Sequence, residues 1–542
     1  MPQSADARPR FSRRELIWLL SVWAVLAVMT ILFAKQNLSV PGLYYDEAVF
    51  AGLAKDFVTG HVHGQHIPNH ETITLFGRPF PFFVQSYLGA LKSWMLIPAF
   101  YLFGPTFAVL RATTLFWAQL ALLFLMLGAW RWLGLGTAII AGALLAFDPN
   151  FFFLSLLDWG VAIPSFLCRC ACFCFAIRWS QQHKLRDAFL VGLFAGLGFF
   201  NKVDYAVLLV SVGIAGFCCY WRQIWALLRT RPHLIALACL GFFLGAGAMV
   251  VKVPGILNSA VSGQYATGPG EFSEKLHTLV AMYDGSYFLR LLTVGGVFEK
   301  MHQEPAAVYS ALGLILIVAC AVLGAMAIGR NRNRKITRAA GFLALSLALT
   351  TLGVFLVPLS VRIHHAILVF PFPQLIIAAA AMFVWDRTSS PRTSRVIQAL
   401  ILTGLLLLLG SQLRAIRKTQ QVILETGGRG RWSESLNQFC RENADRSDLT
   451  IVSLDWGFNE QLMFLTDGPE LAEPFWGFNQ TLPPLPPNPN YIYLAHPLEY
   501  SVLKYDVAYL DQLQKNRTNT EITPHFDRQN EVAFYTIRFR AQ

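Results

Sequence analysis

The sequence predicts an all-α polytopic membrane domain of about eleven transmembrane helices, followed by a C-terminal soluble α/β domain. Hydrophobic residues make up 55% of the 542 residues and charged residues only 14%, which is unlike a water-soluble globule. Apolar runs of roughly 20 residues, long enough for a helix to cross a bilayer, recur as far as about Leu413. After that point the chain is polar and carries prolines, and no such run follows.

Eleven apolar segments are predicted to span the membrane: Glu15–Ala34, Thr106–Trp130, Thr137–Phe151, Val161–Trp179, Ala188–Phe200, Tyr205–Trp221, His233–Val251, Ala306–Gly329, Ala339–Ser360, Ala366–Trp385 and Val396–Leu413. The stretch Pro81–Phe103 is also apolar but contains Lys92 near its middle. If this stretch crossed the membrane, every later loop would change sides and the basic loops would face outward, against the positive-inside rule. We therefore expect a membrane-surface or re-entrant element there.

The basic residues indicate how the chain is oriented. Although the net charge is +12, these residues form short clusters between apolar runs, which argues against a nucleic-acid partner. With a cytoplasmic N-terminus, the densest cluster, Arg330–Lys335, faces inward, as the positive-inside rule requires. Arg414, Arg417 and Lys418 are an exception, because they follow the last span on the outer side. We therefore expect a multi-pass protein of the inner (cytoplasmic) membrane, surrounded by membrane lipids.

The predicted domains follow from this topology. Residues 1–415 form the membrane domain, with long outer loops at 35–105 and 252–305, and residues 416–542 form the soluble domain outside the membrane. In the soluble domain, Leu449–Leu454 and Val532–Phe539 are expected to be strands, and Ser433–Glu442 a helix.

An acidic pair, Asp46-Glu47, lies in the first outer loop and opens a segment with helical periodicity. Carboxylates are favoured at a helix start by the helix dipole, which is a sufficient structural explanation. A carboxylate at a water–lipid boundary can also act as a general base or a metal ligand. The position just after the first span of a many-span protein favours the functional interpretation.

The sequence resembles the C superfamily of membrane glycosyltransferases, in particular the protein O-mannosyltransferases of glycosyltransferase family 39 and the bacterial aminoarabinose transferases. The resemblance covers roughly the first 210 residues and is carried by the order of these motifs: the acidic pair, Phe80-Pro81-Phe82-Phe83, Phe103-Gly104-Pro105 with Arg111, Leu144–Asn150, Leu157-Asp158 and Gly196–Lys202. The prolines after His364-His365 match a pattern near the end of the family's membrane domain. The C-terminal domain resembles no family in this way.

The resemblance implies a sugar donor on a polyprenyl phosphate and an acceptor attacked on the outer side of the membrane. It implies that Asp46 is the catalytic base, that Glu47 supports it, and that Asp158 is the second acidic position. The charge-based topology independently places Asp46 and Asp158 on one face of the membrane. Neither the sugar nor the nature of the acceptor (protein, lipid or glycan) follows from the sequence.

A departing lipid phosphate requires cations to stabilise its charge. Lys202, Arg362 and His365 lie at the outer ends of predicted spans and are candidates for this role, with snorkelling to lipid headgroups as the alternative for the lysine and the arginine. Arg169 lies well inside its span, where a charge is costly and usually functional. Arg111 has a weaker claim of the same kind.

Two further patterns have less specific interpretations. His61, His63 and His66 crowd into the first outer loop, and their spacing suits a divalent metal such as zinc, although such loops often bind metal adventitiously. The sequence Leu157-Asp158-Trp159-Gly160 recurs as Leu454-Asp455-Trp456-Gly457, which we attribute to chance because the two copies fall in different domains.

Two other classes of protein remain as alternatives. The first is a transporter or flippase for a lipid-linked envelope intermediate, which would usually show internal repeats and helices broken near the midplane. No repeat is apparent in the sequence. The second is a non-catalytic scaffold for envelope assembly, against which the presence of both Asp46 and Asp158 argues weakly.

Overall fold

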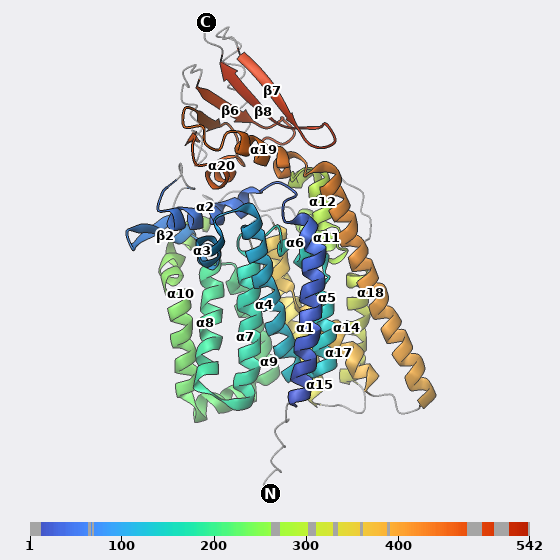
Figure 1. Ribbon diagram of the computed structural model, residues 1–542. Coiled ribbons are helices and arrows are strands. Elements are labelled where there is room, and N and C mark those ends of the chain that lie inside the picture. The colour runs from blue at the N-terminus through green and yellow to red at the C-terminus, as the bar shows by residue number, and fades with distance from the viewer. Residues whose placement is uncertain are drawn as a thin grey trace.

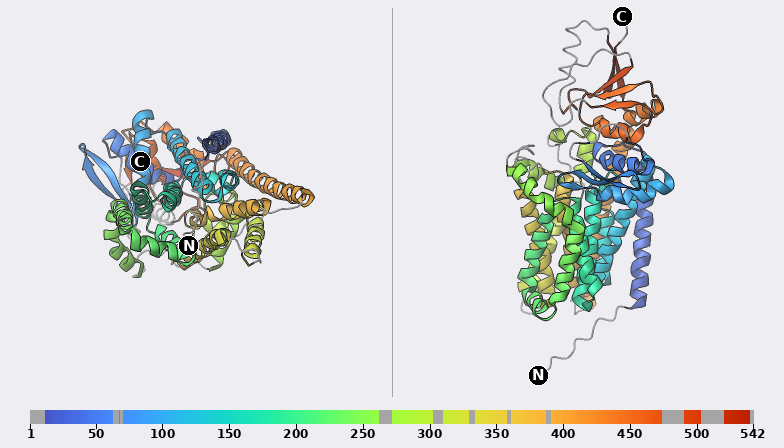
Figure 2. Two further views of the ribbon diagram at one scale, coloured as in Figure 1. Left: turned by 90° about the horizontal axis from the view of Figure 1, so that it is seen from below. Right: turned by 90° about the vertical axis from the view of Figure 1, so that its left-hand side faces the viewer.

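The computed structural model describes residues 12–62, 67, 70–261, 272–301, 310–328, 334–357, 361–386, 391–473, 490–502 and 520–539. Long helices run side by side in a bundle, and a smaller domain with a β-sheet covers one end of it (Figure 1). Helix α1 begins at the opposite end of the bundle. Short helices and a small sheet form a layer between the bundle and the C-terminal domain, as both side views show (Figures 1 and 2).

The bundle contains the long helices α1 (Arg13–Ala34), α4 (Phe107–Leu133), α5 (Leu135–Ala146), α7 (Ala162–Gln182), α8 (Leu185–Asn201), α9 (Tyr205–Thr230), α10 (Pro232–Val261), α14 (Leu312–Ile328), α15 (Arg334–Leu356), α17 (Phe372–Trp385) and α18 (Pro391–Thr426). The intervening short elements are η1 (Lys35–Asn37), α6 (Pro149–Leu154), α11 (Phe272–Tyr283), α12 (Tyr287–Thr293), α13 (Phe298–Met301), α16 (Ile363–Ala366) and η2 (Ile367–Val369).

Within the described residues, eight helices are long and apolar enough to cross a membrane. Each coincides with one of the predicted spans, and the three remaining predictions correspond to the shorter helices α5, α8 and α14, which run alongside the others (Figure 1). The chain is therefore an integral membrane protein. One predicted span, Thr137–Phe151, is interrupted: α5 ends at Ala146, and Asp148 caps the separate helix α6 by accepting the Asn150 N–H at 2.9 Å.

Helix α18 differs from the other spans in how little of it is packed. It is described through Thr426, well past the predicted end of the last span at Leu413, and its buried side chains among the described residues all lie from Leu408 onward. Only 11% of its most apolar window is buried. Seen from below, α18 projects away from the other helices (Figure 2).

The layer at the end of the bundle contains α2 (Tyr45–Thr59), β1 (Glu71–Leu75), β2 (Arg78–Gln85), β3 (Leu88–Gly89) and α3 (Leu91–Phe103). The three strands form an antiparallel sheet in the order β1-β2-β3, and α3 lies beside α2 rather than crossing the bundle. The stretch Pro81–Phe103, predicted to be a membrane-surface or re-entrant element, thus forms β2, β3 and α3 at the end of the bundle. Helix α2 ends at Gly60, whose positive φ of 75° suits the left-handed cap position.

The C-terminal domain is α/β, as predicted. It contains η3 (Gly430–Trp432), α19 (Glu434–Glu442), β4 (Thr450–Ser453), α20 (Asn459–Leu465), β5 (Glu470–Ala472), β6 (Tyr491–Ala495), β7 (Thr520–Phe526) and β8 (Val532–Phe539). The sheet order is β5-β4-β6-β8-β7, with β4 parallel to its neighbours β5 and β6 and the remaining pairs antiparallel. The helix and both strands expected from the sequence lie within two residues of their predicted ends.

Helix α2 joins this domain to the bundle. The buried Lys55 ammonium donates to the carbonyl oxygens of Met463, Phe464 and Thr466 at 3.0–3.1 Å, which satisfies the C-terminal end of α20. Near the start of α2, the Gly42 N–H donates to the Trp432 carbonyl oxygen at 2.7 Å. The acidic pair of α2 therefore lies between the two domains.

Candidate active site

Asp46 and Glu47 occupy the first turn of α2, and their side chains have different environments. Glu47 is 1% exposed and Asp46 is only partly buried. In the part of the chain that the structure describes, Asp46 has no hydrogen bond or ion pair. Of the two acids, Asp46 is the one whose carboxylate can meet a substrate.

Glu47 is held by Arg111 of α4. The Arg111 Nε and Nη2 atoms donate to the two carboxylate oxygens at 3.0 and 2.9 Å, and the Tyr44 N–H donates to Oε2 at 3.2 Å. Arg111 Nη1 also donates to the carbonyl oxygens of Asn37 and Pro41 at 3.0 Å. This fully buried guanidinium therefore clamps the loop before α2.

A second buried pair joins α3 to the loop between α6 and α7. Lys92 Nζ lies 3.2 Å from Asp158 Oδ2 and donates to the Asp158 carbonyl oxygen at 3.3 Å. The Ile163 N–H donates to Asp158 Oδ1 at 3.3 Å. Burial raises the pKa of Asp158, while Lys92 lowers it. Lys92 was treated as an obstacle to a membrane span, and its role as the partner of Asp158 was missed.

These charges act together on Asp46. Burial raises its pKa from 3.8 to about 6, with Lys202 and Lys92 lowering it and Asp158 raising it. The site therefore brings together two carboxylates and two ammonium groups from α2, α3, the α6–α7 loop and the end of α8. A carboxyl group with a pKa just below neutrality is ionised at pH 7 but still accepts a proton readily.

Lys202, at the end of α8, also contacts His365 of the short helix α16. Its Nζ lies 3.1 Å from Asp204 Oδ2 and 2.9 Å from Nε2 of His365. The Arg362 N–H donates to Nδ1 of His365 at 3.2 Å, so a neutral ring carries its proton on Nε2. Nζ and Nε2 are then two facing donors, and the Asp204 carboxylate oxygen Oδ2 lies 3.1 Å from the first and 3.8 Å from the second.

Arg362 lies at the edge of this group and is partly exposed. Its Nη1 is 3.1 Å from Glu274 Oε1, an ion pair in which both side chains are about one quarter exposed. The charge of Lys202 acts on Asp46 and that of Arg362 acts on the adjacent Tyr44, so these two cations and His365 lie near the acidic pair.

Arg169 serves a different purpose from the one expected. Its Nη1 donates to the carbonyl oxygens of Ile367 and Phe370 at 2.7 and 2.8 Å, and its Nη2 donates to Ser165 Oγ at 3.2 Å. The chain leaves α-helical geometry between α16 and α17, where the Ile367 carbonyl oxygen also accepts the Phe370 N–H at 3.0 Å. Arg169 contacts both carbonyls, and it holds the segment that carries His365 rather than reaching the acidic cluster.

The predicted metal site is not assembled in the described part of the chain. His61 is exposed, and His63 and His66 lie outside the described residues. No group of three or more His, Cys, Asp or Glu side chains is arranged to hold a metal among the residues that the structure describes.

An aromatic cluster lies directly beside the acidic pair. Tyr44 stacks on Trp432 with ring centroids 4.1 Å apart, and the rings of Trp159 and Trp456 lie 5.8 and 6.2 Å from it. Tyr45 packs on Trp456 at 4.3 Å. Trp432 and Trp456 belong to the C-terminal domain, so that domain forms one wall of the site.

The two Leu-Asp-Trp-Gly segments meet at this cluster, because Trp159 comes from the first and Trp456 from the second. The two copies belong to different domains, yet both tryptophans lie near the ring of Tyr44. Their aspartates differ in role: Asp158 pairs with Lys92, whereas Asp455 accepts the Val502 N–H at 3.0–3.1 Å. Nothing in the structure explains the repetition itself.

Comparison with known proteins identifies the fold. No protein family model matches the chain, and no curated protein sequence matches it significantly. The structure of ArnT from Cupriavidus metallidurans bound to undecaprenyl phosphate aligns over 98% of each chain, with a TM-score of 0.55 and 13% identity. The apo oligosaccharyltransferase of Archaeoglobus fulgidus aligns over 86% of this chain and 66% of its own length, with a TM-score of 0.51 and 14% identity.

The same archaeal enzyme, tethered to an acceptor peptide containing the NVT sequon, aligns with a TM-score of 0.51 and 13% identity over 84% of this chain and 63% of its own. This chain thus spans just under two thirds of the archaeal enzyme. Identities this low establish a common fold and no more. The chain has the fold of the C superfamily of membrane glycosyltransferases, and the resemblance noted in the sequence is confirmed at that level.

Proposed function

We propose that this protein is a membrane glycosyltransferase that moves a sugar from a polyprenyl-phosphate donor to an acceptor on the outer side of the membrane. The strongest support is the environment of Asp46: a partly buried carboxyl group with a pKa of about 6, under the influence of Lys92 and Lys202, at the end of the bundle that the C-terminal domain covers. The shared fold with an enzyme whose structure contains undecaprenyl phosphate supports the class of donor.

In this proposal Asp46 is the general base. The acceptor hydroxyl oxygen attacks the anomeric carbon of the donor, and the bond from that carbon to the phosphate oxygen breaks. The bonding electron pair leaves with the polyprenyl phosphate, and Asp46 accepts the hydroxyl proton. Glu47 and Arg111 hold the first turn of α2 in place, because their paired charges fix the loop that precedes it.

Lys202 and His365 are the proposed phosphate contacts, with Arg362 at the edge. The facing Nζ and Nε2 donors can both donate to one phosphate oxygen, and Lys202 supplies positive charge where the leaving group becomes more negative. Lys92 pairs with Asp158 and lowers its pKa, which burial raises. Arg169 positions His365 by donating to the carbonyl oxygens of Ile367 and Phe370, which follow His365 in the chain. None of these steps requires a metal ion.

The proposed orientation puts the N-terminus in the cytoplasm and the C-terminal domain outside, in the inner membrane. The acidic cluster and the C-terminal domain share one end of the bundle, and the turns that carry Lys184 with Arg186, and Arg229 with Arg231, lie at the other (Figure 1). Positive charges concentrate on the cytoplasmic side of membrane proteins.

The test is transfer of label from a panel of undecaprenyl-phosphate sugars by the purified protein, with and without EDTA. Asp46→Asn should abolish transfer, while Asp445→Asn, a change of an exposed aspartate in the C-terminal domain, should leave it intact. Near-normal turnover by Asp46→Asn would remove this residue from the mechanism. Movement of an intact donor across vesicle membranes without hydrolysis or transfer would favour a flippase. Loss of transfer in EDTA would show that the reaction requires a divalent metal ion.

A further inference from the structure

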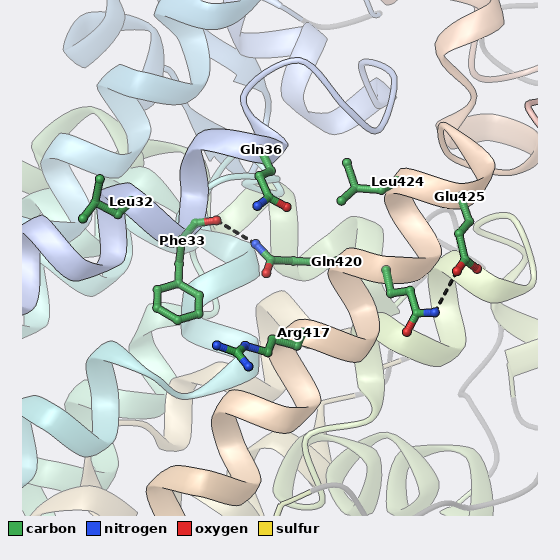
Figure 3. A pocket seen from close by; sticks show the side chains of 8 residues that line it. Leu32, Phe33, Gln36, Arg417, Gln420, Leu424 and Glu425 are labelled. Atoms are coloured by element: carbon green, nitrogen blue, oxygen red, sulfur yellow. Dashed lines mark hydrogen bonds between the residues drawn. The ribbon is translucent and has the colours of Figure 1, made fainter.

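A groove lies between the C-terminal parts of α1 and α18, at the end of the bundle that the C-terminal domain covers. It has a volume of ≈ 650 Å³ and is lined by Leu32, Phe33, Gln36, Arg417, Gln420, Gln421, Leu424 and Glu425. Figure 3 shows these side chains facing one another across the gap between the two helices. None of them belongs to the candidate active site.

The groove lies where both helices change from apolar to polar. On α1, Leu32 and Phe33 are the last large apolar side chains, and the polar Gln36 follows one turn later. On α18, the apolar run ends at Leu413, and Arg417 follows about 6 Å further along the axis, at the helical rise of roughly 1.5 Å per residue. The groove is therefore apolar toward the membrane interior and polar at the depth of lipid headgroups.

Positive charge gathers at the polar level of the groove. Arg417 reaches from α18 toward α1, with its guanidinium carbon 5.8 Å from the Phe33 ring centre (Figure 3). Arg414 and Lys418 are exposed beside it, and in the described part of the chain these three cations form no ion pair. Glu425 is the acid of the groove, but it lies about two helical turns further from the membrane.

Hydrogen bonds from Gln420 hold the floor of the groove. The Gln420 side chain donates to the Phe33 carbonyl oxygen at 2.7 Å and to Asn37 Oδ1 at 2.8 Å. The Asn37 carbonyl oxygen in turn accepts from Arg111, which holds Glu47. A ligand in the groove would thus rest on the network that positions the first turn of α2.

We propose that this groove binds the phosphate headgroup of an anionic bilayer phospholipid. Arg417 contacts the phosphate, and the acyl chains follow the exposed apolar side chains of α1 and α18, such as Leu32, which is 64% exposed. The phosphate gives a role to Arg417, which lies on the side where the positive-inside rule does not expect a cation. A bilayer lipid, rather than the donor, fits because the groove opens sideways on the bundle and none of its residues lines the site around Asp46.

The experiment titrates the purified protein in neutral detergent with phosphatidylglycerol and counts bound lipid by native mass spectrometry. Arg417→Gln should weaken binding about fivefold, the factor expected for one cation near an anionic headgroup, and Arg417→Lys should restore most of it. Arg414→Gln is the matched control, because Arg414 is exposed on the same helix but does not line the groove. Thermal unfolding of each variant shows whether it is folded.

Other ligands and one catalytic variant define the outcomes that would overturn the proposal. Phosphatidylcholine and inorganic phosphate should bind no differently to the wild type and to Arg417→Gln. Equal weakening by Arg414→Gln and Arg417→Gln would show diffuse surface attraction in place of a site. Dependence on Arg417 for undecaprenyl phosphate but not for phosphatidylglycerol would assign the groove to the donor lipid. Asp46→Asn should bind phosphatidylglycerol normally, which separates this proposal from the one about catalysis.

Discussion

The Lys92 ammonium lies 3.2 Å from the Asp158 carboxylate, and both side chains are almost completely buried. The pair joins α3, which lies on the end of the bundle, to the loop between α6 and α7. Both charges also act on Asp46, so this contact sets the electrostatic environment of the proposed base.

Lys92→Met should lower turnover by about two orders of magnitude, because it removes a cation that stabilises developing negative charge in the site. It should also destabilise the protein by ~3–5 kcal/mol, since it leaves Asp158 buried without its counter-ion. Turnover and thermal unfolding are the measurements. The double variant Lys92→Met/Asp158→Asn should recover stability but not turnover. If turnover recovers as well, Lys92 has only a structural role.

The rate of transfer should fall as the pH drops through about 6, by tenfold per unit, because Asp46 with a pKa of about 6 loses its basic form there. Burial and Asp158 both raise this pKa, so Asp158→Asn should move the acid limb to lower pH. Initial rates at saturating donor between pH 5 and 8 test this for the wild type and the variant. An acid limb that stays in place in Asp158→Asn would contradict the assignment to Asp46.

Asp46→Asn should not destabilise the protein at pH 7. The folded-state pKa of about 6 is above the ordinary 3.8, so ionising Asp46 costs stability as the pH rises through that interval. The amide removes this cost, and the unfolding temperature should equal or exceed that of the wild type at pH 7, with a smaller difference at pH 4. A large loss of stability at pH 7 would show that the carboxylate is needed for folding.

Arg111→Met should destabilise the protein by ~3–5 kcal/mol, because Glu47 would remain buried without its partner. The double variant Arg111→Met/Glu47→Gln should recover part of the loss, since no unpaired charge is then left inside. Thermal unfolding of the two single variants and the double variant gives the coupling between the residues. Additive losses would mean that the observed pair contributes little.

Trp432→Leu should lower both turnover and the unfolding temperature, because it removes the ring that stacks on Tyr44 next to Asp46. The lost aromatic contact is worth roughly 0.5–1.5 kcal/mol beyond the area buried. Trp18→Leu, on the exposed side of α1 where Trp18 is 56% exposed, is the control and should have little effect on turnover. Equal effects of the two changes would argue against a role for the C-terminal domain at the site.

Several features of the fold could be predicted because they depend on short stretches of sequence. Hydropathy over about 20 residues locates the membrane helices, and Lys92 together with the positive-inside rule excludes Pro81–Phe103 from the spans. Alternation of polar and apolar residues located β8, and counting spans placed Asp46 and Asp158 at one end of the bundle. Each of these properties is local or follows from a simple count.

The partners of the charged side chains depended on tertiary structure. The sequence gives no reason to pair Lys92 with Asp158, which is 66 residues away, or Arg169 with the Ile367 carbonyl, which is 198 residues away. Arg111 and Arg169 looked like substrate contacts because a buried charge requires a partner, but backbone carbonyls and a buried glutamate supply one as well as a ligand would. The sequence alone therefore determined which segments cross the membrane and which end holds the acids. Only the packing of distant segments decided which cations act on Asp46 and that Trp432 and Trp456 pack on the tyrosines before it. Side-chain pairing is set by distances in space and not along the chain.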